Sequence, residues 1–199
     1  MAFRIRPYHP SDMTALYRVC LLADDGGTGA AGHFKDSDLL GHYWVAPYLV
    51  LEPELASVLV HSGEPVGYTL GTLDSSKFYE KCERGWFPPL RERYPIPVDD
   101  DQTKDAEMIR LIHRGHPVSG DLSAYPAHLH IDILPMGQRQ GWGRKLIDTL
   151  LYQLRDLEVT GVHLGVGKRN TNAIGFYKHI GFHTVQEHIW GFILGMRLK

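Results

Sequence analysis

The sequence has few cysteines and no long apolar run, and each shortage excludes a class of protein. Cys20 and Cys82 are the two cysteines among 199 residues. Two are too few for a disulfide framework, and there is no Cys-x-x-Cys pair to hold zinc. We therefore expect a reducing, cytoplasmic environment. The longest apolar stretch, 43–51, is broken by Pro47, so nothing approaches the roughly 20 apolar residues of a membrane span. We also expect no signal peptide, because residues 1–12 lack an apolar core.

Charge of one sign is also scarce. The chain carries 21 Lys and Arg against 23 Asp and Glu, a net charge of −2. No global field therefore attracts nucleic acid or an anionic membrane, and we expect neither as a partner. Apolar residues make up 43% of the chain and charged residues 22%, which is ordinary for a globular protein. A chain of this length predicts a single domain, 1–199, with a buried core.

Hydrophobic periodicity predicts strands and helices in the mixed order of an α/β protein. Alternation at Phe3 and Ile5 predicts a first strand. Ser11-Asp12 is expected to cap a helix from Met13 that stops at Asp24–Gly29. The other expected elements are a helix at 36–44, a hairpin with strands at 57–61 and 66–73 and its turn at 63–65, a helix at 104–113, a strand at 128–134, a helix at 141–156, a strand at 162–166, a helix at 172–180 and a strand at 189–198.

Residues 74–126 form an insertion that we expect to be largely irregular. Its aromatic side chains lie among several prolines, and the aromatic content argues against disorder. A long excursion inside a compact domain is usually functional or a linker. Two interpretations stay open. The insertion covers an acceptor site as a lid, or it is a structural cap over the sheet or a contact between the subunits of a homodimer.

The segment 134–144 links an expected strand directly to an expected helix. A helix N-terminus offers unpaired N–H groups and a partial positive charge. Gly141 and Gly143 lack side chains, so an anion can approach that backbone, and Arg139 and Arg144 add positive charge. The segment therefore predicts a pyrophosphate cradle. No Walker A string is present, and a Rossmann fingerprint would need a third glycine where Leu146 stands.

Two motifs in the last third of the chain resemble the signatures of GNAT acetyltransferases. Residues 138–143, Gln-Arg-Gln-Gly-Trp-Gly, resemble the family's Gln/Arg-x-x-Gly-x-Gly/Ala motif. Residues 170–182 resemble its second signature through Asn170, Ala173, Phe176, Tyr177, Gly181 and Phe182. The segment 125–132 and the insertion before it are similar to a GNAT subgroup, the C-terminal acetyltransferase-like domain of O-GlcNAcase.

The resemblance implies a fold, a co-substrate and a reaction. The GNAT fold has a central mixed, mostly antiparallel sheet, splayed at the cofactor site and flanked by helices. Acetyl-CoA would give its acetyl group to an amine by direct attack, without a covalent enzyme intermediate. By the same resemblance the cofactor-binding residues are Ile133 and Leu134 along the pantetheine arm, Gln138, Arg139, Gln140, Gly141, Trp142, Gly143 and Arg144 at the pyrophosphate, and Asn170 and Tyr177 near the arm and the thioester.

The candidate catalytic residues are an acid and a base. Tyr177 is placed by the resemblance to protonate the departing thiolate, and the alternative is a packed aromatic. His128, His130 and Asp132 alternate, so they share one face of a strand. His130 and Asp132 are the candidate base, whereas a satisfied hydrogen-bond network is the alternative. Asp74 is the next candidate for the base.

Two other functions stay open. The His-x-His-x-Asp triplet has donors that bind iron or zinc in metal enzymes, although our main interpretation needs no metal. A non-catalytic acyl-CoA-binding or interaction domain is also open, because a fold does not imply activity. The acceptor is not determined, and a small-molecule amine, an amino sugar or a protein lysine all fit.

Overall fold

The computed structural model describes residues 2–23, 32–116 and 120–199, so the expected helix stop at Asp24–Gly29 lies outside the described residues. In the described part, seven strands form one sheet in the order β1-β2-β3-β4-β5-β7-β6. All neighbours are antiparallel except β4 and β5, which are parallel. The strands are β1 Phe3–Pro7, β2 Ser57–His61, β3 Glu64–Thr72, β4 Ala127–Ile133, β5 Gly161–Gly167, β6 His183–Glu187 and β7 Gly191–Arg197.

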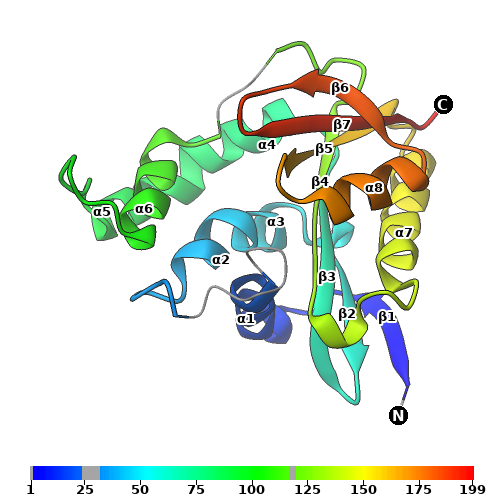
Figure 1. Cartoon of the computed structure of the whole chain (residues 1–199), viewed down its shortest axis with the longest axis horizontal. Helices are drawn as coiled ribbons and strands as arrows, with labels where there is room; N and C mark the ends of the chain where they lie inside the picture. Colours follow the sequence, from blue (N-terminus) through cyan, green and yellow to red (C-terminus); the bar gives the residue numbers. More distant parts are fainter. Residues whose placement is uncertain (1, 24–31, 117–119) are drawn as a thin grey trace.

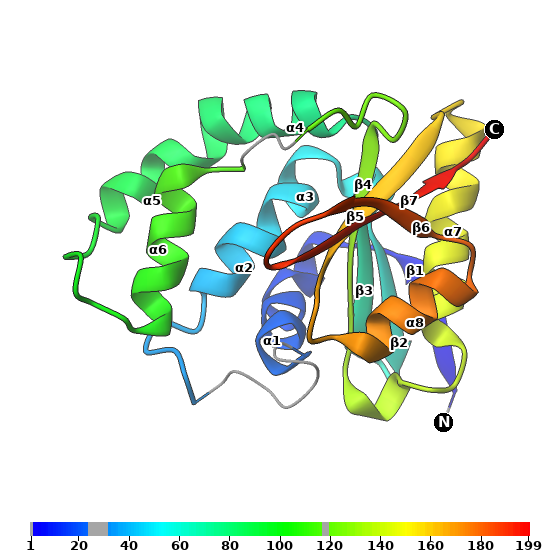
Figure 2. The same cartoon turned by 45° about the horizontal axis from the view of Figure 1, so that its top comes forward.

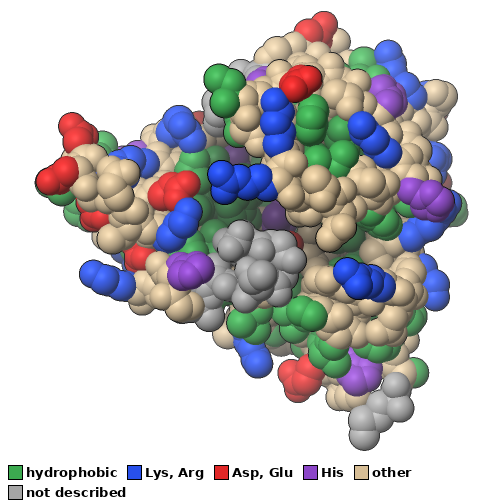
Figure 3. Space-filling model, viewed as in Figure 1, with side chains coloured by type: hydrophobic (Ala, Val, Ile, Leu, Met, Phe, Trp, Pro, Cys, Tyr) green, Lys and Arg blue, Asp and Glu red, His purple; other side chains and the backbone are tan. Residues whose placement is uncertain are grey.

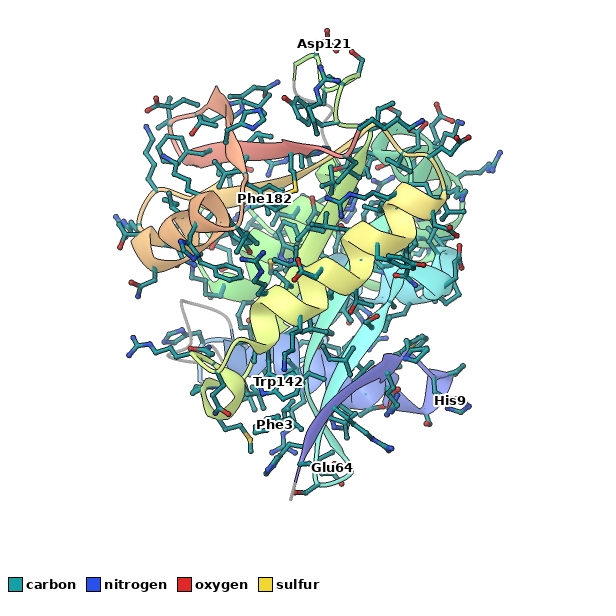
Figure 4. The ribbon with its side chains drawn as sticks, turned by 90° about the vertical axis from the view of Figure 1, so that its right-hand side faces the viewer. Phe3, His9, Glu64, Asp121, Trp142 and Phe182 are labelled. Carbon is teal, nitrogen blue, oxygen red and sulfur yellow. The ribbon has the colours of Figure 1, made fainter. Side chains whose placement is uncertain are left out.

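Helices cover both faces of this sheet (Figure 1). Helix α7, Trp142–Asp156, runs diagonally across one face (Figure 4) and buries the apolar stripe expected from its periodicity. Helices α1 Met13–Ala23, α2 Leu39–Trp44 and α3 Ala46–Leu51 cover the opposite face. Helix α8, Thr171–His179, connects β5 to β6. No helix in the described ranges is long and apolar enough to cross a membrane.

Strand β4 divides its side chains between the two faces, as its alternation predicted. Ala127 and Leu129 join the apolar cluster of α7. His130 stacks on Trp44 of α2, and His128 lies against Tyr48 of α3. The predicted common face of His128, His130 and Asp132 is therefore confirmed, and it is the face that α1–α3 cover.

The insertion is mostly helical, so the expectation of an irregular segment is wrong. It contains α4 Ser75–Lys81, the π-helical turn η4 Cys82–Trp86, α5 Phe87–Arg93 and α6 Lys104–Arg114. Prolines at 88–89 caused the error: they lie in the first turn of α5, where proline costs no hydrogen bond. Phe78, Phe87 and Ile112 are fully buried in the cluster that also contains Leu16 of α1. These contacts support the structural-cap interpretation.

Other boundaries also differ from the expectations. The last strand is two strands, β6 and β7, because residues 188–190 turn back between them. The β2–β3 turn is at Ser62-Gly63, which both have positive φ angles of 56° and 95°. Pro47 does not break the apolar stretch but lies in the first turn of α3. The short elements also include the 3-10 turns η1 Pro10–Asp12, η3 Pro53–Leu55 and η5 Pro135–Gly137.

The start of α1 also differs from the expected cap at Ser11-Asp12. These residues lie in the turn η1, before the helix. The Asp12 carboxylate accepts the His9 N–H at 3.0 Å and pairs with the Arg6 guanidinium at 2.6 Å. The hydrogen bond from Arg6 and the charge of Arg6 lower the pKa of Asp12. Asp12 therefore ties β1 to the turn instead of capping α1.

Candidate cofactor and acceptor site

Strands β4 and β5 separate soon after they meet. They pair only at Ala127–Val162 and His128–His163, whereas β3 stays paired with β4 as far as Ile133. Strand β5 turns to β7 instead and pairs with it along its whole length. In Figure 2, β5 runs at an angle across β4, in the direction of β7. One edge of β4 is therefore open inside the sheet from Leu129 onward.

The gap is closed on one face only. On the α7 side, Leu129 of β4 and Leu164 of β5 belong to the same buried cluster as Leu150 of α7. On the opposite face β5 presents Gly165 and Gly167, which are exposed and have no side chain. A ligand can therefore reach the gap from the face that carries His130 and Asp132.

The hydrogen bonds of β3 determine which backbone groups of β4 face the gap. Leu134 N–H donates to Val66 O at 2.9 Å, toward β3. Because backbone groups alternate in direction along an antiparallel strand, the N–H groups of Leu129, Ile131 and Ile133 point the other way, into the gap. Ile133 is therefore well placed for the pantetheine arm.

Leu134 is not placed for that role. Its N–H is bonded to Val66, and its carbonyl accepts the Gly137 N–H at 2.8 Å. Both of its backbone polar groups thus have partners inside the protein. The backbone N–H of Ile131 points into the gap, whereas that of Leu134 does not. The sequence did not reveal this role of Ile131, because the direction of an N–H group depends on the strand register.

The predicted cradle has the form of an anion site. Among the hydrogen bonds of the described residues, none is donated by the backbone N–H groups of residues 139–144. Arg139 and Gly141 have positive φ angles of 57° and 81°, and such alternation turns successive N–H groups to one side. A Cβ atom on Gly141 would meet no atom within 4 Å. Gln138 Nε2 donates to Ile133 O at 2.7 Å and so fastens the turn to β4.

The side chains around the cradle have different roles. Arg139 is exposed, and Arg144 is exposed beside Asp148, with Nε 3.4 Å from Oδ2. The Trp142 ring packs on Phe3 at 5.6 Å, as Figure 4 shows, and Lys145 lies 4.1 Å above it. Trp142 therefore offers the cradle its backbone only. Gln140 Nε2 donates to Met136 O at 2.8 Å and closes the turn.

Helix α8 supplies the two residues of the second motif. Asn170 Oδ1 accepts the Ala173 N–H at 3.1 Å as the helix cap, so its NH2 group remains for a ligand. Tyr177 is half-buried between Phe176 and Phe182, at 5.4 and 5.8 Å. Its hydroxyl makes no hydrogen bond within the described residues. Burial raises the pKa of Tyr177, and the charge of Asp132 raises it further, so this phenol keeps its proton at neutral pH.

A cluster centred on Tyr68 holds the candidate base. The Tyr68 hydroxyl donates to Asp132 Oδ2 at 2.5 Å and lies 3.1 Å from His130 Nε2. Because its hydrogen goes to Asp132, His130 Nε2–H is the donor to Tyr68, and it also lies 3.2 Å from Asp132 Oδ2. Burial and the charge of Asp132 raise the pKa of Tyr68. The side chains of His130 and Asp132 are 26% and 21% exposed, so a ligand can reach them. Trp44 stacks on His130 at 5.8 Å.

His128 belongs to a separate network. Its Nε2 lies 2.7 Å from the Tyr48 hydroxyl and its Nδ1 2.7 Å from Ser75 Oγ, which donates to Pro126 O. Burial lowers the pKa of His128, so the ring is neutral. The network interpretation therefore fits His128, and the His-x-His-x-Asp triplet does not converge on one point.

Asp74 lies at the other end of β4. Its carboxylate accepts the Lys77 N–H at 3.1 Å as the cap of α4. It follows Thr72, which pairs with His128, whereas Gly67 pairs with Ile133. Five residues of strand separate the two pairs by about 17 Å. Asp74 therefore cannot act on an acyl group near Ile133.

Sequence reasoning missed three residues around His130 and Asp132, the part of the site that we call the acceptor side. Tyr68 and Trp44 touch the candidate base, and Cys20 of α1 contributes a sulfur atom to the same place. Cys20 and Tyr68 had only the pattern of core residues on an apolar helix face and a strand. Their meeting with His130 depends on how α1 packs on the sheet, which one sequence does not reveal.

The comparison with protein families matches this geometry. The model of the acetyltransferase (GNAT) family matches residues 13–182. The chain belongs to the GNAT acetyltransferase family. This GNAT chain is 29% identical to Protein O-GlcNAcase of Rattus norvegicus over 188 residues, which are 93% of the chain and 20% of that protein. The same figures hold for the Mus musculus protein. The chain thus spans a fifth of the length of these curated relatives.

Solved structures confirm the GNAT fold. The crystal structure of SsHAT is 37% identical, has a TM-score of 0.92 and covers 100% of both chains. PaiA N-acetyltransferase of Thermoplasma acidophilum, solved in complex with coenzyme A, has a TM-score of 0.57 at 12% identity, with 99% of each chain covered. The second likeness shows the fold alone. The predicted mixed, mostly antiparallel sheet flanked by helices is therefore confirmed, as is the predicted similarity to O-GlcNAcase.

Proposed function

We propose that this GNAT domain transfers an acetyl group from acetyl-CoA to an amine by direct attack. The observation that supports this most is the open edge of β4. It lies between the anion cradle at one end and, on the adjacent face, the cluster of Tyr68, His130 and Asp132. An extended thioester along that edge and an amine at the cluster would meet, and such positioning accounts for much of the acceleration of a two-substrate reaction.

The residues present fit acetyl-CoA. The N–H groups of residues 139–144 have no backbone partner, so they are available to the pyrophosphate. Ile131 and Ile133 turn their backbone toward the gap, where the pantetheine arm would pair, and the Asn170 amide is available beside it. Acetyl-CoA would supply an acyl group on a good leaving group.

Acyl transfer to an amine needs a base for the amine's proton, a donor to the oxygen that becomes negative, and an acid for the departing sulfur. The chain has a group for each. Asp132, with His130 beside it, holds the acceptor ammonium and takes its proton, directly or through water. A backbone N–H of Ile131 or Ile133 stabilises the negative charge that develops on the acyl oxygen. Tyr177 is protonated at neutral pH, as tyrosines ordinarily are, and its phenol donates a proton to the departing sulfur.

One observation favours a second candidate, a domain that binds acyl-CoA without turnover. The Tyr68 hydroxyl already satisfies Asp132 and His130 within the protein, as a purely structural network would. This candidate predicts CoA binding without release of thiol. The acceptor stays open between a small-molecule amine, an amino sugar and a protein lysine. Basic and acidic side chains are mixed on the face of the molecule that Figure 3 shows. This mixture does not favour a highly charged acceptor.

The test compares two aspartates that the sequence offered as bases. A panel of amines is assayed for release of free CoA thiol, and CoA affinity is measured by calorimetry. Asp132→Asn should lower kcat at least about tenfold with little change in CoA affinity. Asp74→Asn is the matched control: it keeps a capping residue on α4 and should keep full activity.

Three results would contradict the proposal. The absence of calorimetric binding to CoA excludes the cofactor site. CoA binding without thiol release from any amine establishes the non-catalytic candidate. Full activity of Asp132→Asn, with normal stability, places the base elsewhere.

A further inference from the structure

Cys20, His130 and Asp132 bring three different metal-binding atoms together. Within the ranges 2–23, 32–116 and 120–199, the Cys20 sulfur, a His130 ring nitrogen and an Asp132 carboxylate oxygen lie within 4.8 Å of one another. The thiol comes from α1, and the other two side chains come from β4. Packing of the helix on the strand thus creates a cluster that neither element has alone.

The spacing suits a small tetrahedral ion. Zinc binds imidazole nitrogen and carboxylate oxygen at about 2.0–2.2 Å, so two such ligands of a tetrahedral site lie about 3.3 Å apart. His130 Nε2 and Asp132 Oδ2 are 3.2 Å apart. The Tyr68 hydroxyl contacts both atoms and is also hydrogen-bonded to Cys20. The Tyr68 hydroxyl therefore holds the three ligand side chains in one place.

The chemistry of the donors selects zinc among the common divalent ions. Sulfur, nitrogen and oxygen together suit a borderline-soft ion such as zinc, whereas Mg²⁺ and Ca²⁺ prefer six or more oxygen ligands. A thiolate and a carboxylate would balance the two positive charges of the ion. This balance matters because Cys20 is only 3% exposed, and a buried uncompensated charge is costly.

We propose that Cys20, His130 and Asp132 form an inhibitory zinc site, with the fourth position open to water. Binding releases the thiol proton of Cys20 to solvent, and the His130 hydrogen moves from Nε2 to Nδ1, so that Nε2 can bind the ion. Zinc then occupies the Asp132 carboxylate that would otherwise receive the proton of the amine, together with the His130 nitrogen beside it. Binding itself does not depend on the proposed function, whereas the inhibition rests on it.

The binding experiment uses the full chain without a histidine tag, under a non-coordinating reductant and without CoA or amine. Co²⁺ is titrated as a spectroscopic substitute for zinc, because a cobalt–thiolate bond gives a charge-transfer band. We expect one ion per chain, displaced by Zn²⁺. Cys20→Ala and Cys20→Ser should both lose the band and weaken zinc binding at least about tenfold, since losing even an outer-shell partner costs that much.

Cys82→Ala is the matched control, because Cys82 is also buried but lies outside the cluster. It should keep the band and the wild-type affinity. Two Cys20 variants guard against misfolding, and an unchanged CoA affinity in calorimetry shows that each is folded. A Cys20→Ser protein that keeps wild-type affinity, or a wild type without the band, overturns the site.

The activity arm separates this proposal from the proposed function. Zinc should suppress thiol release in proportion to its occupancy, and Cys20→Ser should resist it by at least about tenfold in zinc concentration. Zinc bound through Cys20 with undiminished activity overturns the inhibition. A chain that releases no thiol with any amine refutes the proposed function, and the spectroscopic arm then decides the metal site alone.

Discussion

At the scale of single residues, the Tyr68 hydroxyl gives the acceptor side its arrangement. Tyr68 is fully buried on β3 and reaches across to two side chains of β4. Its single hydrogen goes to Asp132, so the hydrogen on His130 Nε2 is directed to Tyr68 and Asp132. A buried phenol in this position holds the carboxylate and the imidazole in one geometry, and this matters because a proton acceptor must be within hydrogen-bond reach of its donor.

Tyr177 differs from Tyr68 in having no hydrogen-bond partner within the described residues. We therefore expect Tyr177→Phe to keep the fold, because no hydrogen bond within the protein is broken and the ring contacts with Phe176 and Phe182 remain. If the phenol protonates the departing sulfur, kcat should fall at least about tenfold while CoA affinity stays unchanged. Steady-state kinetics and calorimetry measure the two effects. Unaltered kcat would leave Tyr177 as a packed aromatic.

The sequence predicted these residues unequally. Asp132 and His130 followed from alternation, and Tyr177 from the resemblance, because each depends on local spacing. Tyr68, Cys20 and Trp44 were not predicted, since their roles arise from pairing between β3 and β4 and from helix packing on the sheet. Leu134 was assigned to the cofactor arm from its position in the motif, but its N–H is hydrogen-bonded to Val66 O of β3.

At the scale of elements, the turn between β4 and α7 carries the cofactor prediction. Gly141→Ala adds a Cβ atom that meets no protein atom within 4 Å. The added cost to folding is therefore mainly that of a positive φ angle of 81°, about 1–2 kcal/mol for a residue with a side chain. The same Cβ atom would project into the space above the free N–H groups. We expect CoA affinity to fall at least about tenfold, a loss of about 1.4 kcal/mol.

Gly63→Ala provides a control for the backbone strain. Gly63 has a positive φ angle of 95° in the β2–β3 turn, and its Cβ atom would also meet no atom within 4 Å. It should therefore lower the melting temperature about as much as Gly141→Ala while CoA affinity stays at the wild-type value. Calorimetry and thermal unfolding measure both variants. Equal CoA affinities for the two would show that the cradle does not bind the pyrophosphate.

The elements were predicted well where the pattern is local. Helix α7 and strand β4 followed from periodicity, and α6 was expected at 104–113. Helices α4 and α5 were not predicted. The prolines of α5 suggested a loop, and the sequence alone does not reveal what the apolar side chains of either helix pack against. Trp86 illustrates this: its indole donates to His42 O at 2.8 Å, so it attaches the insertion to α2.

At the scale of the whole molecule, the insertion and the N-terminal helices share one core, and that core contains an acid-sensitive group. His116 lies among Tyr43, Tyr79 and Phe87, with ring centroids 4.5, 4.7 and 5.4 Å away. Its Nε2 is buried without a hydrogen-bond partner in the described residues. Burial lowers the pKa of His116 to about 4, against about 6.5 for an unperturbed histidine.

This depressed pKa determines the sign of a pH effect. Above about pH 6.5 the imidazole is neutral in both states, and its contribution to stability is fully present. As the pH falls toward about 4, His116 binds a proton in the unfolded chain but not in the folded chain. The free energy of unfolding therefore decreases. Each such proton contributes up to about 1.4 kcal/mol per pH unit. Denaturant unfolding over this range should show a smaller slope for His116→Phe than for the wild type, and equal slopes would refute the assignment.

That the chain forms a single domain stays a prediction, which partial proteolysis of the whole chain would address. Its expected environment was inferred from cysteine usage and stays a prediction as well. The fold, by contrast, was predicted correctly as a whole, because two motifs at fixed places in the chain determine where the cofactor strand and the following helix lie.

The one-sided gap between β4 and β5 also bears on the order in which two ligands would bind. Helix α7 and its apolar cluster form a floor, and the exposed glycines of β5 leave the other side open. If the pantetheine arm lies along β4 and the acceptor lies outside it on the open face, as proposed, the bound acceptor would cover the arm. We then expect acetyl-CoA to bind first and CoA to leave last.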